Sequence, residues 1–289
     1  MAISRNGGIR VTVPVRTPLE AAAGLAISWP LRLFIWVEIL FGVAAIATIA
    51  LMPSETARYF AWPIKPNVTA ALLGAFYISA GGLFILAAFT RRWQMIRVLV
   101  IPAMLFTLFE LIATFLHWDR FAVGTTPFMV WFASYLLPPP VFAACYIWHQ
   151  RRSPKRQADA PLSPMVRNTL WVLGIAVAGE GLISFIWPAV LINSAPWTLS
   201  PLTTRAICGW LISLGTMMLS VAWENDRDRG RVVAPYFILL LPALVLQLSR
   251  YSHEVNWSHP RIGSGAVFLT IVLAIGIYLA RGNWRRSFQ

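Results

Sequence analysis

The chain has 289 residues, of which 58% are hydrophobic and only 12% are charged, and its mean hydropathy is +0.65. Soluble domains carry about 25% charged residues, so this composition excludes a water-soluble globule. The formal net charge of +13 is divided into short clusters between apolar runs, which is typical of charges that orient membrane helices and argues against a nucleic-acid partner.

Residues 1–28 precede the first long apolar run. They contain Arg5, Arg10 and Arg16, with Glu20 as the counter-charge. Organellar transit peptides share this composition, but no short apolar core with a small-residue cleavage site follows. We therefore interpret the segment as a cytoplasmic tail, with its last part in the membrane interface.

Eight apolar runs follow, and each is at or near the length that spans a bilayer at 1.5 Å per residue. They predict an all-α integral membrane protein with eight transmembrane helices. The runs cover residues 30–52, 67–90, 94–117, 127–149, 168–188, 202–223, 232–250 and 264–283.

The basic residues orient these spans. When the 24 Lys and Arg residues are assigned to alternate sides, eighteen lie on the side of the N-terminus and six on the other. The positive-inside rule then places both termini in the cytoplasm. The polytopic form without organellar features favours a bacterial plasma membrane.

The chain also matches itself when it is shifted by 135 residues. The matches include rare residue types and need no gap, so we interpret them as an internal duplication. They are Ser28/Ser163, Arg32/Arg167, Trp36/Trp171, Val37/Val172, Pro53/Pro188, Trp62/Trp197, Pro66/Pro201, Thr69/Thr204, Ala71/Ala206 and Gly74/Gly209.

The duplication divides the chain into a first four-helix repeat at 29–152, a cytoplasmic linker at 153–166 and a second repeat at 167–289. Because four is an even number of spans, both repeats start on the same side. The repeats are therefore parallel, and a pseudo-two-fold axis along the membrane normal is expected between them. The interface of the repeats is then the natural place for a binding site.

Glu180 and Arg205 are charged where the first repeat has Ala45 and Ala70. They lie on adjacent antiparallel helices at depths that differ by roughly 6 Å. We expect an intramembrane ion pair, which either lines a polar site or clamps the two helices together.

Other charged residues in the spans are Glu110, with His117 one heptad later, and Glu38. Glu110 is interpreted either as a proton-titrating carboxyl in a pathway or as a neutral, hydrogen-bonded core carboxyl. Glu38 is expected to pair with Arg97, near the cytoplasmic face.

The fourth span contains Pro138, Pro139 and Pro140 near its middle, and the eighth does not. Three prolines remove three backbone donors, so a break or strong kink is expected. Such breaks mark substrate sites in transporters, but they also serve simple packing. The small residues 79–82 in the second span are interpreted as a helix-packing face.

Several familiar motifs do not fit. His253 and His259 lack the spacing of a zinc protease, although a metal site formed with His117 on the outer face is an alternative. Residues 224–229 have mixed charge and are interpreted as a solvated cytoplasmic loop. No catalytic residues, resident metal or cofactor are predicted.

The leading functional hypothesis is a carrier of a small molecule or ion, with its site between the repeats. An accessory or scaffold subunit that binds lipid or a membrane protein is the alternative. A third hypothesis is an intramembrane enzyme or sensor that acts on a lipid or a quinone. The bilayer is the expected partner in all three cases.

Overall fold

The computed structural model describes residues 25–153, 158 and 160–281. Most of the predicted tail at 1–28 and part of the predicted linker at 153–166 lie outside these residues. Eight helical spans have the length and the apolar composition needed to cross a bilayer, which confirms the predicted polytopic membrane protein.

The long helices are α2 (Trp29–Ala45), α4 (Asn67–Phe89), α5 (Trp93–Leu116), α6 (Thr126–Leu136), α7 (Pro138–Arg152), α8 (Pro164–Ile186), α10 (Pro201–Glu224), α12 (Ala234–Arg250) and α13 (Pro260–Ala280). Short helical turns connect or extend them. These are η1 (Ile46–Ala50), η2 (Pro53–Glu55), α3 (Thr56–Tyr59), η3 (Trp118–Arg120), α9 (Ala189–Ile192), α11 (Arg227–Gly230), η4 (Arg231–Val233) and η5 (Ser252–Glu254).

Hydroxyl side chains fix where several spans begin. Thr125, Ser163 and Ser200 each accept a backbone N–H from the residue three positions later, at the starts of α6, α8 and α10. A proline stands within the first two positions of each of these helices, where its missing N–H costs nothing. The same residue pattern that interrupts the apolar runs therefore also starts the helices.

Four helices, α4, α5, α10 and α12, form the centre of the bundle. In α10, 72% of the most apolar stretch is buried, against 22% in the first span and in α13. In the centre α4 contacts α12 and α5 contacts α10, while α2 packs on α4, α8 on α10, α7 on α5 and α13 on α12. Each of these contacts within or from the first four spans has a counterpart made by the equivalent helices of the last four.

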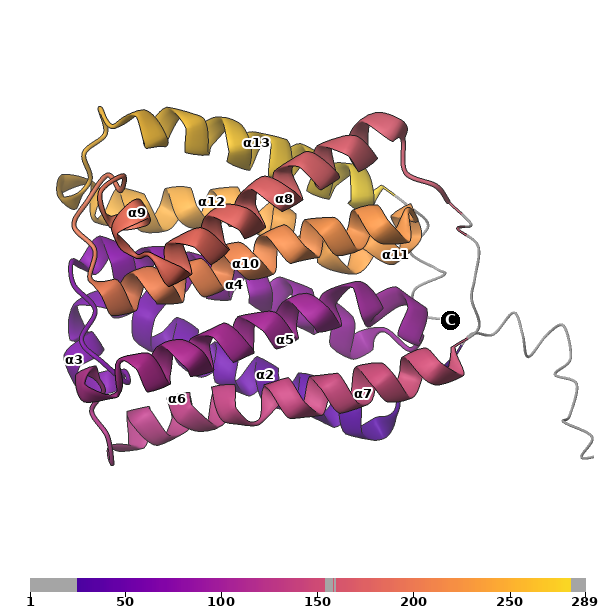
Figure 1. Cartoon of the computed structure of the whole chain (residues 1–289), viewed down its shortest axis with the longest axis horizontal. Coiled ribbons are helices and arrows are strands. Elements are labelled where there is room, and N and C mark those ends of the chain that lie inside the picture. The colour runs from indigo at the N-terminus through magenta and orange to yellow at the C-terminus, as the bar shows by residue number, and fades with distance from the viewer. Residues whose placement is uncertain (1–24, 154–157, 159, 282–289) are drawn as a thin grey trace, which may run out of the picture.

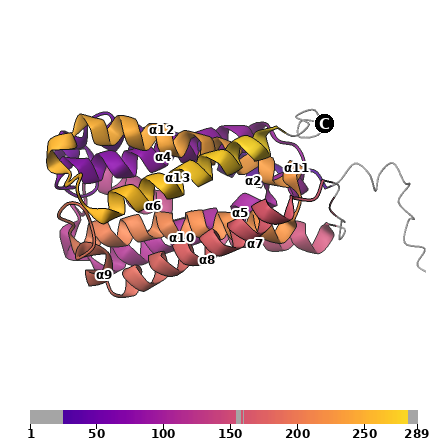
Figure 2. The same ribbon diagram turned by 90° about the horizontal axis from the view of Figure 1, so that it is seen from above.

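Figures 1 and 2 show the long helices side by side, with α3 and α9 at one end of the bundle and α11 at the opposite end. At the end of α3 and α9, polar contacts tie the first four spans to the last four. Trp197 Nε1 donates to Thr69 Oγ1 at 2.9 Å, and the Val68 backbone N–H donates to Glu254 Oε2 at 2.6 Å. Arg250 donates to the Ala50 carbonyl at 2.5 Å, so the two groups of spans are bound together at this end.

Candidate functional site

A cavity of about 440 Å³ lies between α2, α4, α5 and α6, with α10 and α12 behind it. This volume is within the range of about 300–1,000 Å³ that small-molecule pockets occupy. Its lining includes Val43 of α2 and Val130 of α6, which are 58% and 40% exposed. Both residues belong to membrane spans, so an opening of the cavity beside them faces the region that lipid covers in a membrane.

Missing side-chain volume makes this space. A Cβ atom added to Gly42 would meet nothing within 4 Å, and one added to Gly81 would meet only Ile46 Cδ1 at 3.8 Å. Gly82, in contrast, packs against α12, because a Cβ there would lie 2.6 Å from Leu239 Cδ1. The predicted packing face at 79–82 thus packs at Gly82, while Ala80 and Gly81 border the cavity.

Glu38 is the acidic residue of the cavity. Of the described residues that line it, no other is acidic and none is Lys, Arg or His. Glu38 Oε1 is buried without a hydrogen-bond partner among the described residues. The expected pairing with Arg97 is wrong, because Glu38 lies nine residues into α2 and Arg97 only four into α5, so their depths differ by roughly 7 Å.

Two tyrosines and a group of aromatic rings form the polar and apolar walls of the cavity. The hydroxyl groups of Tyr77 on α4 and Tyr135 on α6 share a short hydrogen bond. The Trp210 ring lies 4.0 Å from Phe106 and 4.9 Å from Tyr77, and the Trp131 ring lies 4.2 Å from Tyr135, all between centroids. Aromatic rings thus line this cavity together with Glu38.

Glu110 lies next to this cavity but does not line it. Its side chain is 1% exposed, and neither carboxyl oxygen has a hydrogen-bond partner among the described residues. The carboxyl fits against α10 because residue 209 is glycine, where a Cβ would lie 2.5 Å from Oε1. Tyr77 and Tyr135 are within electrostatic range of both Glu110 and Glu38, so the hydroxyl pair lies in the field of both carboxyls.

The predicted ion pair between Glu180 and Arg205 is wrong. Glu180 Oε1 instead lies 2.5 Å from Arg261 Nη1, on α13. Arg205 donates from Nε to the Phe185 carbonyl at 3.0 Å and contacts His117 Nε2 through Nη1 at 2.6 Å. The depths of the two residues in the membrane are compatible with a pair. However, depth does not fix the direction in which each side chain leaves its helix, and the two side chains contact different helices.

His117 is the C-cap of α5, outside the membrane-spanning segment. Burial lowers the pKa of its imidazole below the usual value, and the positive charge of Arg205 lowers it further. The neutral ring can therefore accept the Arg205 N–H. This contact joins the third span to the sixth.

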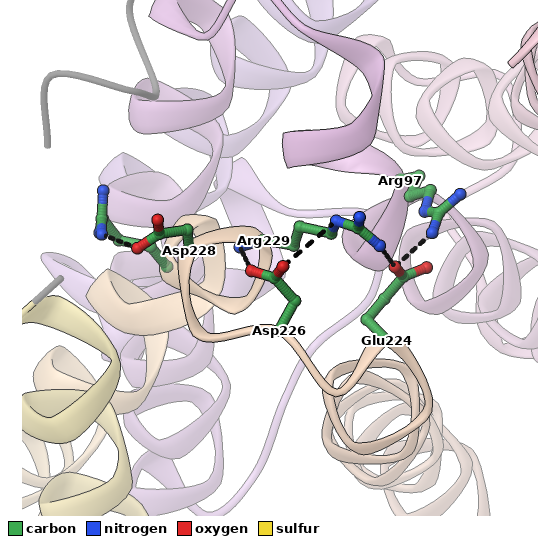
Figure 3. A network of polar contacts seen from close by, with 6 residues as sticks. Arg97, Glu224, Asp226, Asp228 and Arg229 are labelled. Carbon is green, nitrogen blue, oxygen red and sulfur yellow. Dashed lines mark hydrogen bonds and ion pairs between the residues drawn. The ribbon is translucent and has the colours of Figure 1, made fainter. Parts of the chain in front are cut away.

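A charge network lies at the other end of the bundle (Figure 3). Glu224 Oε2 accepts from Arg97 Nη2 and, at 2.9 Å, from Arg229 Nη1, and Asp226 caps α11 by accepting the Arg229 backbone N–H at 3.1 Å. Asp228 and Arg231 form a further pair at 2.5 Å. The expectation of a solvated loop at 224–229 is wrong.

The residues of this loop are buried because they turn into the bundle. Asp226 is 1% exposed and Arg231 is 1% exposed. Gly230 allows the close approach, since a Cβ there would lie 2.9 Å from Val221 Cγ1. Mixed charge along the sequence therefore reflects internal pairing here, as buried charges require.

At the three prolines the regular helix of the fourth span is interrupted, but the span continues from Thr126 to Arg152. α6 ends at Leu136 and α7 begins at Pro138, and Leu137 between them keeps right-handed helical angles. The interruption is thus confined to one residue. Pro138, Pro139 and Pro140 are not among the cavity-lining residues, and their role in a site stays a prediction.

His253 and His259, near the outer end of the bundle, have different surroundings. His253 is exposed, and His259 Nδ1 accepts the Arg261 backbone N–H at 3.3 Å as the N-cap of α13. Within the described parts of the chain, no group of three or more His, Cys, Asp or Glu side chains has an arrangement that could hold a metal ion.

Of the candidate site residues predicted from the sequence, Glu38 alone lines the cavity. Glu110, Glu180 and Arg205 instead lie near the Cys208 thiol. The sequence reasoning missed Tyr77, Tyr135 and Trp210. One feature of the sequence indicates this wall of the cavity. Tyr77 and Gly81 are four residues apart and so lie on one helix face, where a hydroxyl group stands beside a residue without a side chain.

Comparison of the chain with family models, with curated proteins and with solved structures finds no match. The class of the protein, a polytopic helical membrane protein, therefore rests on its own eight spans.

Proposed function

We propose that this polytopic membrane protein is a carrier that binds a small, largely apolar molecule in the cavity between α2, α4, α5 and α6. One observation carries this proposal. The cavity has the volume of a ligand site, it opens toward lipid, and it holds a few polar groups in a mainly apolar wall. This is the composition expected of a site that orients a lipophilic ligand by few hydrogen bonds.

We also propose that the chain arose by duplication of a four-helix unit, with the repeats at 29–152 and 167–289 parallel and both termini in the cytoplasm of a bacterial cell. The exchangeable set of helix contacts supports this proposal. So do equivalent local contacts: Arg32 donates to the Ala88 carbonyl and Arg167 to that of Ala222, each joining the first helix of its repeat to the end of the second.

The proposed site differs in place from the site first expected at the interface of the repeats. Most of the lining belongs to the first repeat, and the second contributes Trp210, Ser213, Met217 and Tyr236. The second repeat thus forms the back wall of a site that opens beside α2.

The proposal is tested with Gly42→Phe, which adds a large side chain at a residue that lines the cavity and where an added Cβ meets nothing within 4 Å. Gly179→Phe is the matched control, since a Cβ at Gly179 on α8 also meets nothing and this residue does not line the cavity. Purified proteins in nanodiscs are irradiated with a diazirine-bearing long-chain alcohol, and the labelled peptides are mapped by mass spectrometry.

We expect labelling of the cavity-lining peptides of α2, α4 and α6 to fall at least about fivefold in Gly42→Phe and to stay at the wild-type level in Gly179→Phe. Equal labelling of these peptides in both variants would refute the site. For carriage, cells that express each protein are compared for steady-state accumulation of radiolabelled decanol, decylamine and decanoate. If the wild-type protein changes the accumulation of one of these compounds and Gly42→Phe does not, the result supports a carrier.

The alternatives give different results in the same experiments. A scaffold predicts no preferential labelling of the cavity peptides and no change in accumulation. An enzyme or sensor predicts preferential labelling without a change in accumulation, and an enzyme also predicts that the bound molecule is recovered in altered form.

A further inference from the structure

We propose that the ligand is a lipophilic organic cation and that Glu38 is its counter-ion, exchanging a proton for the cation. This inference rests on the proposed function and names the class of ligand for the same cavity. It starts from the composition of the lining, in which Glu38 is the sole acid and basic residues are absent among the described residues.

The position of Glu38 leaves its charge without a partner among the described residues. Oε1 is buried and unpaired within the described chain, and Arg97, the arginine expected beside it, donates to Glu224 instead. An isolated carboxylate inside a bilayer is costly, so a carboxyl in this position needs either a proton or a cation. The empty cavity therefore favours the protonated acid, and a bound cation favours the carboxylate.

The other titratable groups that line the cavity add no positive charge. Among the described residues they are tyrosines: Tyr59 on α3, Tyr77 on α4, Tyr135 on α6 and Tyr236 on α12. The carboxyl of Glu110 on α5 also acts on the Tyr77–Tyr135 pair. A cation that enters the cavity thus meets only neutral or acidic groups.

The walls suit the apolar part of such a ligand. Trp210, Phe106 and Tyr77 form one aromatic cluster with centroid separations of 4.0 and 4.9 Å, and Trp131 and Tyr135 form another. Aromatic rings attract cations, most strongly where water is excluded. Aromatic walls around one carboxyl recognise a charged but poorly hydrated ligand, such as a quaternary ammonium or phosphonium ion.

The exchange balances in charge and atoms. One monovalent cation binds, the Glu38 carboxyl loses one proton to the aqueous phase, and the net charge of the occupied site equals that of the empty one. No bond of the ligand is made or broken. The apparent affinity for the cation is therefore expected to fall about tenfold for each unit by which the pH lies below the range where Glu38 titrates.

The test uses tritiated tetraphenylphosphonium and the full chain in zwitterionic lipid nanodiscs, with empty nanodiscs as the blank for partition into lipid. Glu38→Gln removes the counter-ion and keeps the shape of the side chain. Glu55→Gln is the control, because Glu55 is an exposed acid of η2 that does not line the cavity. We expect the Kd to rise at least about tenfold in Glu38→Gln and to change less than about twofold in Glu55→Gln.

A second measurement needs the wild-type protein alone. When tetraphenylphosphonium is added in weak buffer below the titration range, about one proton per bound cation is expected to appear in solution. Labelling of Glu38→Gln by the diazirine alcohol shows that its cavity is still formed. If that variant does not fold, the proton release of the wild type decides alone.

The outcomes separate this inference from the proposed function. If the alcohol labels the cavity but the phosphonium does not bind, binds Glu38→Gln with unchanged affinity, or binds without proton release, then the ligand class is wrong and the cavity function stands. If neither probe reaches the cavity, the proposed function itself fails.

Discussion

Gly215 is the position where the sequence constrains the packing of the bundle most tightly. It lies on α10, the most buried span, where α10 crosses α8. A Cβ at this residue would lie 2.7 Å from Ala178 Cβ and from the Gly174 carbonyl oxygen, and closer still to the Ala178 backbone nitrogen. These atoms belong to backbone or to a rigid Ala side chain, so none can rotate away.

The expected effect of Gly215→Ala follows from these distances. Ordinary contacts of a Cβ begin near 3.4 Å, so α8 and α10 must separate by most of an ångström along their crossing. Overpacking of this kind costs about 1–3 kcal/mol. In a chain of this size the cost corresponds to a decrease in Tm of roughly 2–8 °C.

The assay is thermal unfolding in detergent, followed with a thiol-reactive dye, because Cys208 is fully buried in the folded protein. Gly179→Ala is the control on the same helix pair, since a Cβ at Gly179 meets nothing within 4 Å. This control should leave the Tm unchanged or raise it slightly, because Ala in place of Gly stabilises a helix by up to about 1 kcal/mol. If the two variants melt alike, the close crossing of α8 and α10 is not as described.

Three further changes test the charged contacts at the ends of the bundle. The pKa of His117 is lowered in the fold, so the unfolded chain binds more protons below its usual value near 6.5. Stability should therefore be full above about pH 6.5 and fall as the pH drops toward the lowered value, and His117→Gln should lose this part of the pH dependence of Tm. Glu224→Gln should cost about 3 kcal/mol, because Arg97 and Arg229 then lose the shared carboxylate at a site where the side chains of the Arg97–Glu224 pair are only 14% and 11% exposed. Glu180→Gln should cost less than Glu224→Gln, because Glu180 forms one ion pair whose side chains are each 37% exposed, whereas Glu224 is more buried and joins two arginines; a larger loss of Tm than in Glu224→Gln would contradict this ranking.

Hydropathy made the eight spans predictable, because transfer of the backbone into lipid is possible only when a long apolar stretch is helical. The predicted and observed starts agree within one residue at Thr126 and Pro201, but at Pro260 the helix begins four residues before the predicted apolar run. Where a helix continues past the apolar run, the sequence gives no boundary. The seventh span illustrates this, since it begins at Arg227, among charges that the fold pairs internally.

Partners of charged residues were less predictable, because spacing along a helix gives depth but not rotation. Glu180 and Arg205 have compatible depths, yet Glu180 turns toward α13 and Arg205 toward α5. The helix neighbours of α8 and α10 decide these directions, and they are set by tertiary packing. For Glu38 and Arg97, the observed starts of α2 and α5 show that the two residues lie at different depths in the membrane.

The cavity could not be predicted from the sequence, because it forms where small residues of different helices leave space between them. Gly42 and Gly81 leave space only because α2 and α4 bring them to the same opening. Gly82, one residue further on, is filled by Leu239. The same residue type therefore has opposite consequences at neighbouring positions, depending on which helix lies opposite.

The peripheral place of α2 has a consequence for how a ligand reaches the cavity. α2 packs mainly on α4 and takes no part in the central contacts among α4, α5, α10 and α12. Displacing the middle of this span, between the contacts of Arg32 with the Ala88 carbonyl and of Ala50 with Arg250, would widen the opening beside Val43 and leave the central contacts in place. For the proposed carrier, we infer that α2 acts as the gate, and we expect a cross-link between α2 and α6 to block entry of the ligand without disturbing the contacts among the four central helices.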